Sequence, residues 1–373
     1  MSNRNLIAPG LCLALAAACG GDPPQDLTVE IPAGVSSETI SLLRLPAGGG
    51  EPSLYRPASL ARIDWNGPDR LPAITRPLGF DPDDEMVYGA GKDGAIIGLD
   101  MLARRFRSYL PRSEVQSGTQ DGMVLVLDSA NRALRFDNRT ATSYRAAVEP
   151  GAVQLVRGTG GRINAYNPSA GLLQVLGEEG EIRRYTVPSG HLSSSWFGDL
   201  LIIVTDSGLV TIRPAVDSTP SFERIRGNPV AAVPSPSAHR IYLARGRGDL
   251  LLLDRFTLDE VGSVQLPGVA RELRPDRSGR WLLARAETGD TAWVVDLVSQ
   301  ELVAPLATTW QGDLPLIVGG TTLIARSGKD VAGWDITSTE LRPTGRITDG
   351  SGDHYLLIDW RPGGRAPAPA PAP

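Results

Sequence analysis

The sequence predicts an all-β protein, and within that class a β-propeller built from four-stranded antiparallel blades. With 42 glycines and 30 prolines in 373 residues, the chain is rich in turns, which excludes a fold of long helices. The 41% of hydrophobic residues against 21% of charged ones is the balance of a globular protein with a real core. An apolar hairpin recurs about every forty residues, and four short strands at that period are typical of a propeller blade.

The first eighteen residues predict a secretory signal peptide. They hold one charge, Arg4, and an apolar run from Leu11 to Ala18 that is too short to span a bilayer. Cys19 follows three alanines and resembles the bacterial lipoprotein signal, which implies that Cys19 is lipidated as the first mature residue. The resemblance thus divides the N-terminus into a lipoprotein signal peptide (1–18) and a spacer (19–26). Ordinary secretion, with an incidental Cys19, is the alternative.

Seven hairpin units follow along the chain. Their first long apolar strands begin at Val87, Met123, Arg162, Leu200, Ile241, Trp281 and Thr321. Each is followed by two further short strands, and another short strand precedes it. In several units, the strand directly after the long apolar strand ends on an aspartate. These aspartates are Asp100, Asp137, Asp254, Asp296 and Asp335. Such an aspartate can accept a hydrogen bond from the backbone two residues on, so these carboxylates are predicted to fix turns rather than to bind a metal.

Apolar strands remain on both sides of the seven units. Residues 353–360 look like the first strand of another blade, and 39–45, 53–57 and 59–65 supply three more strands. A composite blade of both ends would close the ring and protect its edges, which predicts eight blades within 27–362. Seven blades with flanking strands is the alternative. Beyond the ring, the Pro/Ala-rich 363–373 predicts a disordered tail.

Residues 227–257 resemble the YVTN-type repeat of bacterial envelope propellers, in the wider WD-repeat-like and quinoprotein-like group. The resemblance rests on the strand-turn-strand segment from Gly227 to Arg245 and on the next strand, which leads to Thr257. The turns at Asp276 and Asp81 resemble the first turn of that repeat. The family implies the fold more than an activity, because its members are mostly binding or scaffold proteins and some quinoprotein relatives are dehydrogenases.

Motifs for catalysis and metal binding are sparse. The net charge of −5 excludes a nucleic-acid surface. His191 and Ser195 are the closest approach to a base and a nucleophile, and no Gly-x-Ser-x-Gly elbow accompanies them. The acidic turn from Asp81 to Glu85 could hold calcium but is more typical of a solvated loop. We therefore predict no catalytic residue, metal or cofactor.

One face of the ring is the predicted binding surface. The turns between the second and third strands of the blades and the connections between blades gather there, and loops of this kind often carry function. They contain Lys92, Arg245, Arg247 and Lys329, and Trp310 precedes the seventh unit. Lys92 and Lys329 are the only lysines of the chain, and Arg and Trp are enriched at binding hot spots.

These features predict a membrane-anchored lipoprotein of the bacterial cell envelope, facing the periplasm or the cell exterior. It would be a non-catalytic propeller scaffold that binds a partner protein or an envelope polymer. An envelope enzyme, either a quinoprotein-like oxidoreductase or a hydrolase, is one alternative. A sensor of small ligands or glycans is another.

Overall fold

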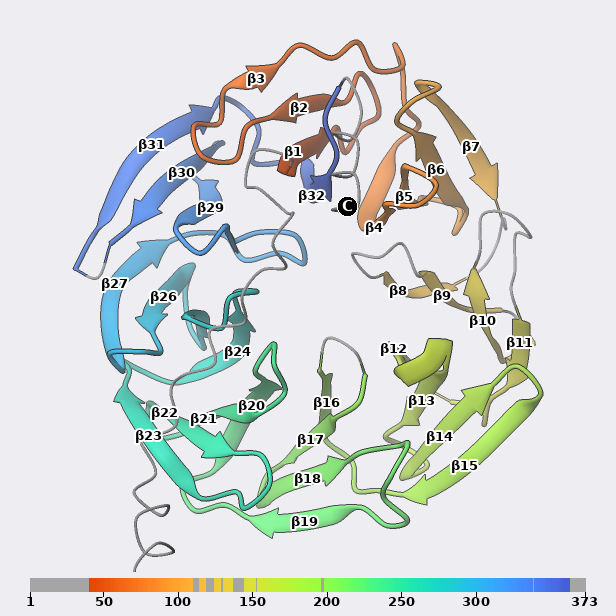
Figure 1. Ribbon diagram of the computed structural model, residues 1–373, viewed down its shortest axis with the longest axis vertical. Coiled ribbons are helices and arrows are strands. Elements are labelled where there is room, and N and C mark those ends of the chain that lie inside the picture. Colours follow the sequence, from red (N-terminus) through yellow and green to blue (C-terminus); the bar gives the residue numbers. More distant parts are fainter. Residues whose placement is uncertain are drawn as a thin grey trace, which may run out of the picture.

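The computed structural model describes residues 40–109, 114–118, 124–128, 130–136, 144–151, 153–195, 198–337 and 339–362. These residues form a ring of eight four-stranded antiparallel sheets (Figure 1). The predicted eight-bladed propeller is confirmed, and the seven-bladed alternative is wrong. The signal segment, Cys19, residues 27–39 and the tail 363–373 lie outside the described residues.

The first four blades consist of consecutive strands, given from the inner to the outer edge. Blade 1 contains β4 (Ile74–Asp81), β5 (Met86–Gly91), β6 (Ile96–Asp100) and β7 (Arg105–Tyr109). Blade 2 contains β8 (Glu114–Gly118), β9 (Val124–Leu127), β10 (Arg132–Phe136) and β11 (Tyr144–Ala147). Blade 3 contains β12 (Gln154–Arg157), β13 (Ile163–Asn167), β14 (Leu172–Gly177) and β15 (Gly180–Thr186). Blade 4 contains β16 (His191–Ser194), β17 (Leu201–Thr205), β18 (Gly208–Ile212) and β19 (Ser221–Arg224).

The next three blades repeat this order, and the eighth joins the two ends of the ring. Blade 5 contains β20 (Pro229–Pro234), β21 (Arg240–Arg245), β22 (Asp249–Asp254) and β23 (Glu260–Gln265). Blade 6 contains β24 (Ala270–Pro275), β25 (Trp281–Ala286), β26 (Thr291–Asp296) and β27 (Glu301–Ala307). Blade 7 contains β28 (Leu316–Val318), β29 (Thr322–Ser327), β30 (Asp330–Ile336) and β31 (Leu341–Ile347). Blade 8 contains β32 (His354–Asp359), β1 (Ile40–Leu45), β2 (Ser53–Tyr55) and β3 (Arg62–Ile63).

Blade 8 is the predicted composite blade. Its inner strand β32 comes from the C-terminal end of the ring and pairs antiparallel with β1 over six residues, from Ile40 opposite Asp359 to Leu45 opposite His354. Pairing the two ends completes a sheet whose two faces pack against blade 7 and blade 1. The indole of Trp360, just after β32, contacts Trp65 edge-on with 6.0 Å between ring centroids and donates a hydrogen bond to Glu85 of blade 1.

The core is divided into eight apolar layers, one between each pair of neighbouring blades. The third strand of blade 5 shows the cause, because alternate side chains of a strand point to opposite faces of the sheet. Leu250 and Leu252 pack toward blade 6, whereas Leu251 and Leu253 pack toward blade 4. A strand between two sheets is buried on both faces, which explains its uninterrupted run of leucines.

Three of the predicted structural turns are present, at Asp100, Asp254 and Asp296, whereas at Asp335 the backbone N–H of Thr337 donates to the carbonyl of Glu340 instead. The Asp100 carboxylate accepts a hydrogen bond from the backbone of Ala103, Asp254 from Phe256 and Thr257, and Asp296 from Val298. The backbone N–H groups of Asp83 and Asp84 donate to Asp81 in the acidic turn of blade 1. Within the described residues, the only helix is the short 3₁₀ turn η1 (Thr159–Gly161), and no helix is long and apolar enough to cross a membrane.

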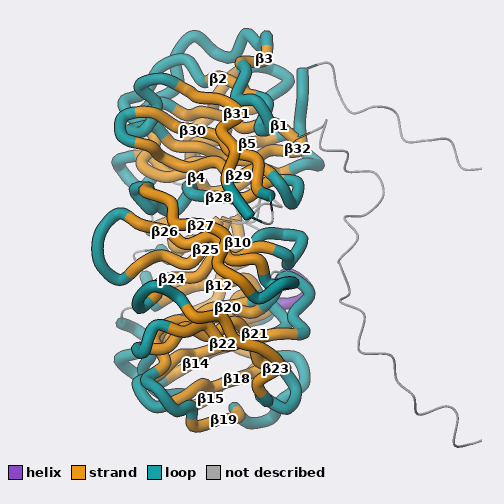
Figure 2. Tube along the Cα trace, turned by 90° about the vertical axis from the view of Figure 1, so that its left-hand side faces the viewer, coloured by secondary structure: helices purple, strands orange, loops and turns teal. Residues whose placement is uncertain are grey.

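The alternation of strands gives the ring two different faces. The turns between second and third strands form what we call the hairpin face. The turns between first and second strands, and between third and outer strands, form the opposite face. We call it the terminal face, because Ile40 and Asp359 are paired there at the two ends of the described ring. Figure 2 shows the ring edge-on, with η1 marking the terminal face.

Candidate functional site

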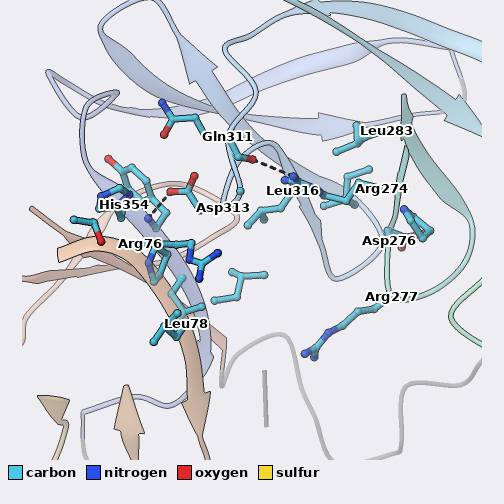
Figure 3. A pocket seen from close by; sticks show the side chains of 18 residues that line it. Arg76, Leu78, Arg274, Asp276, Arg277, Leu283, Gln311, Asp313, Leu316 and His354 are labelled. Atoms are coloured by element: carbon cyan, nitrogen blue, oxygen red, sulfur yellow. Dashed lines mark hydrogen bonds between the residues drawn. The ribbon is translucent and has the colours of Figure 1, made fainter. Parts of the chain in front are cut away.

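A cavity of about 630 Å³ lies inside the ring against the inner strands of blades 6, 7, 8 and 1. Its walls are formed by β4, the end of β24, the approach to β28, and β32 (Figure 3). The apolar part of the wall comes from side chains such as Leu78, Leu316 and Leu357. The polar part includes Arg274 and Arg277 of blade 6 together with Arg76 of blade 1, which lines the same cavity only because the ring closes.

Arg76, Arg274 and Arg277 supply the positive charge of this cavity. Arg76 lies on β4, and Figure 3 shows it approaching the open space from the side opposite to Arg277, which follows β24. Burial within the ring lowers the pKa of Arg277 below its ordinary value, while the nearby Asp359 opposes this effect. A guanidinium stays protonated over the physiological range, so the cavity keeps this positive charge, and the side chains of Arg76 and Arg277 remain exposed to solvent.

Arg274 is held in place by backbone carbonyls and by an aromatic ring. Its guanidinium donates to the carbonyls of Pro315 (2.7 Å) and Gln311 (3.0 Å), and it lies over the ring of Trp310 with 4.5 Å to the centroid. Burial lowers its pKa, and the attraction of Glu272 partly offsets this. The carbonyls and the aromatic face orient Arg274 and link blade 6 to blade 7.

The two carboxylates of the cavity wall are occupied by internal hydrogen bonds. Asp276 accepts from the backbone of Trp281 (2.8 Å) and from the backbone and hydroxyl of Ser278. Asp313 accepts from both terminal nitrogens of Arg326 and from the backbone of Tyr355 (2.8 Å). Because these acids are already satisfied, the cavity can attract an anionic group through its arginines.

The five predicted binding residues are all near the hairpin face, but they differ in exposure. Lys92, Arg247 and Lys329 are exposed in the turns of blades 1, 5 and 7. Arg245 and Trp310 are buried. Partner binding by these residues stays a prediction, and in this structure only the three exposed cations are available to a partner at the surface.

Arg245 is buried because it forms an ion pair across the β21–β22 hairpin. Both its Nε and a terminal nitrogen bond the carboxylate of Asp249, and it also donates to the carbonyl of Arg226. The exposed Arg247 bonds the same carboxylate (2.8 Å). Burial alone would raise the pKa of Asp249, but the hydrogen bonds from Arg245 and Arg247 outweigh it and lower the pKa.

The structure separates the other residues considered for catalysis. His191 begins β16 and Ser195 follows its end, so the strand length lies between them. The Ser195 hydroxyl bonds the Asp199 carboxylate and accepts from the backbone of Leu200, which makes it part of a structural turn. Among the residues that the structure describes, no three His, Cys, Asp or Glu side chains are grouped so as to hold a metal ion.

Sequence reasoning missed the arginine-lined cavity. Arg76, Arg274 and Arg277 stand on or beside inner strands, where no motif distinguishes them from the many other arginines of the chain. The available signal was that these arginines stand on or beside predicted inner strands. Predicting the cavity from this signal would have required knowing which residues of each inner strand face the ring axis.

Comparison with solved structures supports the fold. A dihydro-heme d1 dehydrogenase, NirN, solved in complex with DHE, is 16% identical, with a TM-score of 0.56 over 84% of this chain and 75% of NirN. Apo AztD from Citrobacter koseri is 12% identical, with a TM-score of 0.58 over 86% of this chain and 97% of AztD. Hsv2 from Kluyveromyces lactis is 8% identical, with a TM-score of 0.56 over 74% and 99%. At these identities the likeness shows the propeller fold alone.

No protein-family model matches the chain. No curated protein matches it in sequence either.

Proposed function

We propose that this protein is a non-catalytic binding propeller of the YVTN type, tethered to a bacterial envelope membrane through a lipid on Cys19. The N-terminal signal pattern and the closed propeller support this proposal. The partner is a protein or polymer of the envelope that presents an anionic group, either a carboxylate or a phosphate.

The arginine-lined cavity carries the proposal. Arg76 and Arg277 line one open cavity from different blades, and Arg274 is oriented beside them. Guanidinium groups match the planar geometry of carboxylates and phosphates and bind them through paired, charge-assisted hydrogen bonds. The arginines would receive an anionic group of the partner, while the exposed cations of the hairpin face would steer the partner toward the ring.

A binding role fits this geometry better than a hydrolase. The acids of the cavity wall, Asp276 and Asp313, are occupied by structural bonds, and His191 and Ser195 stand at opposite ends of a strand. A general base must be within hydrogen-bond reach of the group that it deprotonates. Neither carboxylate is free for that task, and the serine is bound elsewhere.

Crosslinking and recovery from native membranes test the proposal. The wild-type protein should recover a defined envelope partner, and the Arg76→Glu/Arg277→Glu variant should recover at least about tenfold less, since two charge-assisted contacts become repulsions. Arg342→Glu is the matched control, because Arg342 is an exposed arginine on the outer strand of blade 7. Equal recovery by the cavity variant and the control would refute binding at the cavity. Visible absorbance of the purified protein would instead favour the oxidoreductase alternative.

A further inference from the structure

The exposed apolar side chains of this propeller are distributed unequally between its faces. Among the described residues, eight large apolar side chains are exposed, and all belong to the turn between the third and outer strands or to the first three residues of an outer strand. They are Leu102, Phe106, Ile182, Val216, Phe222, Phe256, Val261 and Val298. Both positions lie toward the terminal face, and the turns of the hairpin face contain none of the eight.

The most exposed of these side chains stand at the tips of hydrogen-bonded turns. Phe256 is 63% exposed and Val298 is 56% exposed. Each lies two residues after an aspartate, and its backbone N–H donates a hydrogen bond to the carboxylate of that aspartate. Leu102 is 63% exposed in the equivalent turn of blade 1. Val216 is 68% exposed in a turn of blade 4 that is fixed by the bond between Arg213 and Asp217. Because the turns are already ordered, holding these side chains against another surface costs little further conformational entropy.

The chain enters and leaves the ring on this same face. Ile40 and Asp359 are paired at its edge, so the segment that leads back to Cys19 joins the ring there. About twenty residues separate Cys19 from Ile40, and such a chain can extend to at most about 70 Å. A tether of that reach keeps the ring close to the membrane but does not by itself decide which face turns toward it.

We propose that the terminal face lies against the lipid bilayer that holds Cys19, with the apolar turn tips entering the interfacial region. This proposal rests on the lipid anchor of the proposed function and adds an orientation to it. A planar partner explains the distribution, because the apolar tips belong to blades 1, 3, 4, 5 and 6 and an extended flat surface can contact all of these blades at once. Exposed apolar side chains bind the headgroup boundary in proportion to the area that they bury. The hairpin face and its cations then point away from the membrane, toward a partner.

The test uses the full lipidated protein in vesicles of phosphatidylethanolamine and phosphatidylglycerol. After removal of the signal peptide, Cys19 is the only native cysteine, so a single added cysteine can carry a fluorophore. Val298→Cys places it on the terminal face and Lys329→Cys on the hairpin face, both at exposed turn positions. Spin-labelled lipid should quench the label at 298 at least about threefold more than the label at 329, because the membrane interface extends only about 5–10 Å.

A second variant tests the cause of the orientation. Leu102→Ser, Phe256→Ser and Val298→Ser together should leave melting and vesicle flotation unchanged, since these side chains are exposed and the anchor is intact. With the label at 329, quenching in this variant should rise toward the value expected for random orientation. Unchanged quenching at 329 would contradict a role for the apolar turns.

The outcomes separate the anchor from the orientation. If the protein floats with vesicles and labels at 298 and 329 are quenched alike, the anchor stands and the orientation is wrong. If neither the wild type nor the Cys19→Ala variant floats, the anchor fails, and the orientation fails with it. Shielding of the label at 298 in detergent that grows with protein concentration would identify a second copy of the chain as the occupant and overturn the membrane proposal.

Discussion

Asp313 and Arg326 form a bidentate ion pair that ties blade 7 to the strand that closes the ring. Both N–O distances are 2.9 Å, and the side chains are 3% and 1% exposed. Arg326 also donates to the carbonyls of Ser351 and Asp353, and Asp313 accepts from the backbone of Tyr355 on β32. The pair therefore holds the last inter-blade connection before the ring closes.

Arg326→Met should lower the free energy of unfolding by about 3–5 kcal/mol, because removing one partner leaves the other charge buried and unpaired. Denaturant unfolding at pH 7 measures the change. Lys329→Met is the control, since Lys329 and Asp349 form an ion pair that is 77% and 72% exposed and should contribute less than about 1 kcal/mol. Equal effects of the two substitutions would show that the buried pair does not stabilise the closure.

Deletion of residues 353–360 should abolish cooperative unfolding. Without β32, the backbone of β1 loses its hydrogen-bond partner on the inner side, which leaves an open sheet edge in blade 8. The deletion also removes Asp353, which forms an ion pair with Arg44. Differential scanning calorimetry would show a broad transition or none. Deletion of 363–373 is the matched truncation and should leave the melting temperature unchanged; a strand deletion that melts like wild type would contradict ring closure by β32.

The pair of Arg245 and Asp249 should make stability depend on pH in the acid range. The pKa of Asp249 is lowered in the folded state, so the pair contributes stability above about pH 4, the unfolded value, and loses it as the pH falls through the folded pKa. Asp249→Asn should cost about 3–5 kcal/mol at pH 7. The difference from wild type should shrink when unfolding is measured near pH 3. A difference that is constant with pH would rule out the carboxylate as the source.

Trp310→Ala should destabilise the fold rather than act only on binding. The ring is buried between blades 6 and 7 and supports the guanidinium of Arg274. Removing a buried tryptophan costs about 3–5 kcal/mol. Thermal unfolding would detect it, and Trp310→Phe should recover part of the loss. If Trp310→Ala melts like wild type while partner binding is lost, Trp310 is a surface anchor after all.

The exposed cations of the hairpin face should affect association with the partner and not the fold. Lys92→Gln and Lys329→Gln should each change stability by no more than about 0.5 kcal/mol. Arg247→Gln should cost up to about 1 kcal/mol, because it loses a bond to the buried carboxylate of Asp249. Together the three substitutions should slow association with the recovered partner and weaken its salt dependence, because rim charges act mainly through long-range attraction. Arg342→Gln on the outer strand is the control. Association kinetics identical to wild type at two salt concentrations would place the binding surface elsewhere.

The blade period was predictable because it depends on interactions between residues that are close in the sequence. A short apolar strand, a Gly/Asp/Asn turn and a return strand recur in one order, and turn residues such as Asp254 and Asp296 bind the backbone two residues away. The composite blade was also predictable, since unpaired apolar strands at both ends of a ring can satisfy their backbone groups only by pairing with each other.

The exposure of individual cations was not predictable in the same way. Arg245 and Arg247 are two residues apart in one hairpin, yet one is buried and the other is exposed. The direction that each side chain takes depends on the position of Asp249 and on the neighbouring backbone at Arg226. Trp310 likewise became a packing residue because Arg274, from the preceding blade, covers its ring.

By itself, the sequence determined the class of fold and the blade period and favoured eight blades with a composite closing blade over seven, because strands and turns follow from hydrophobic periodicity and from hydrogen bonds between near neighbours. Only the tertiary structure decided where charge and apolar surface gather. Arg76 and Arg274 are about two hundred residues apart in the chain and share a cavity because eight twisted sheets return the last blade to the first. The eight exposed large apolar side chains of the described residues lie toward one face for a related reason, since antiparallel strands send every third-to-outer turn of the ring to the same side.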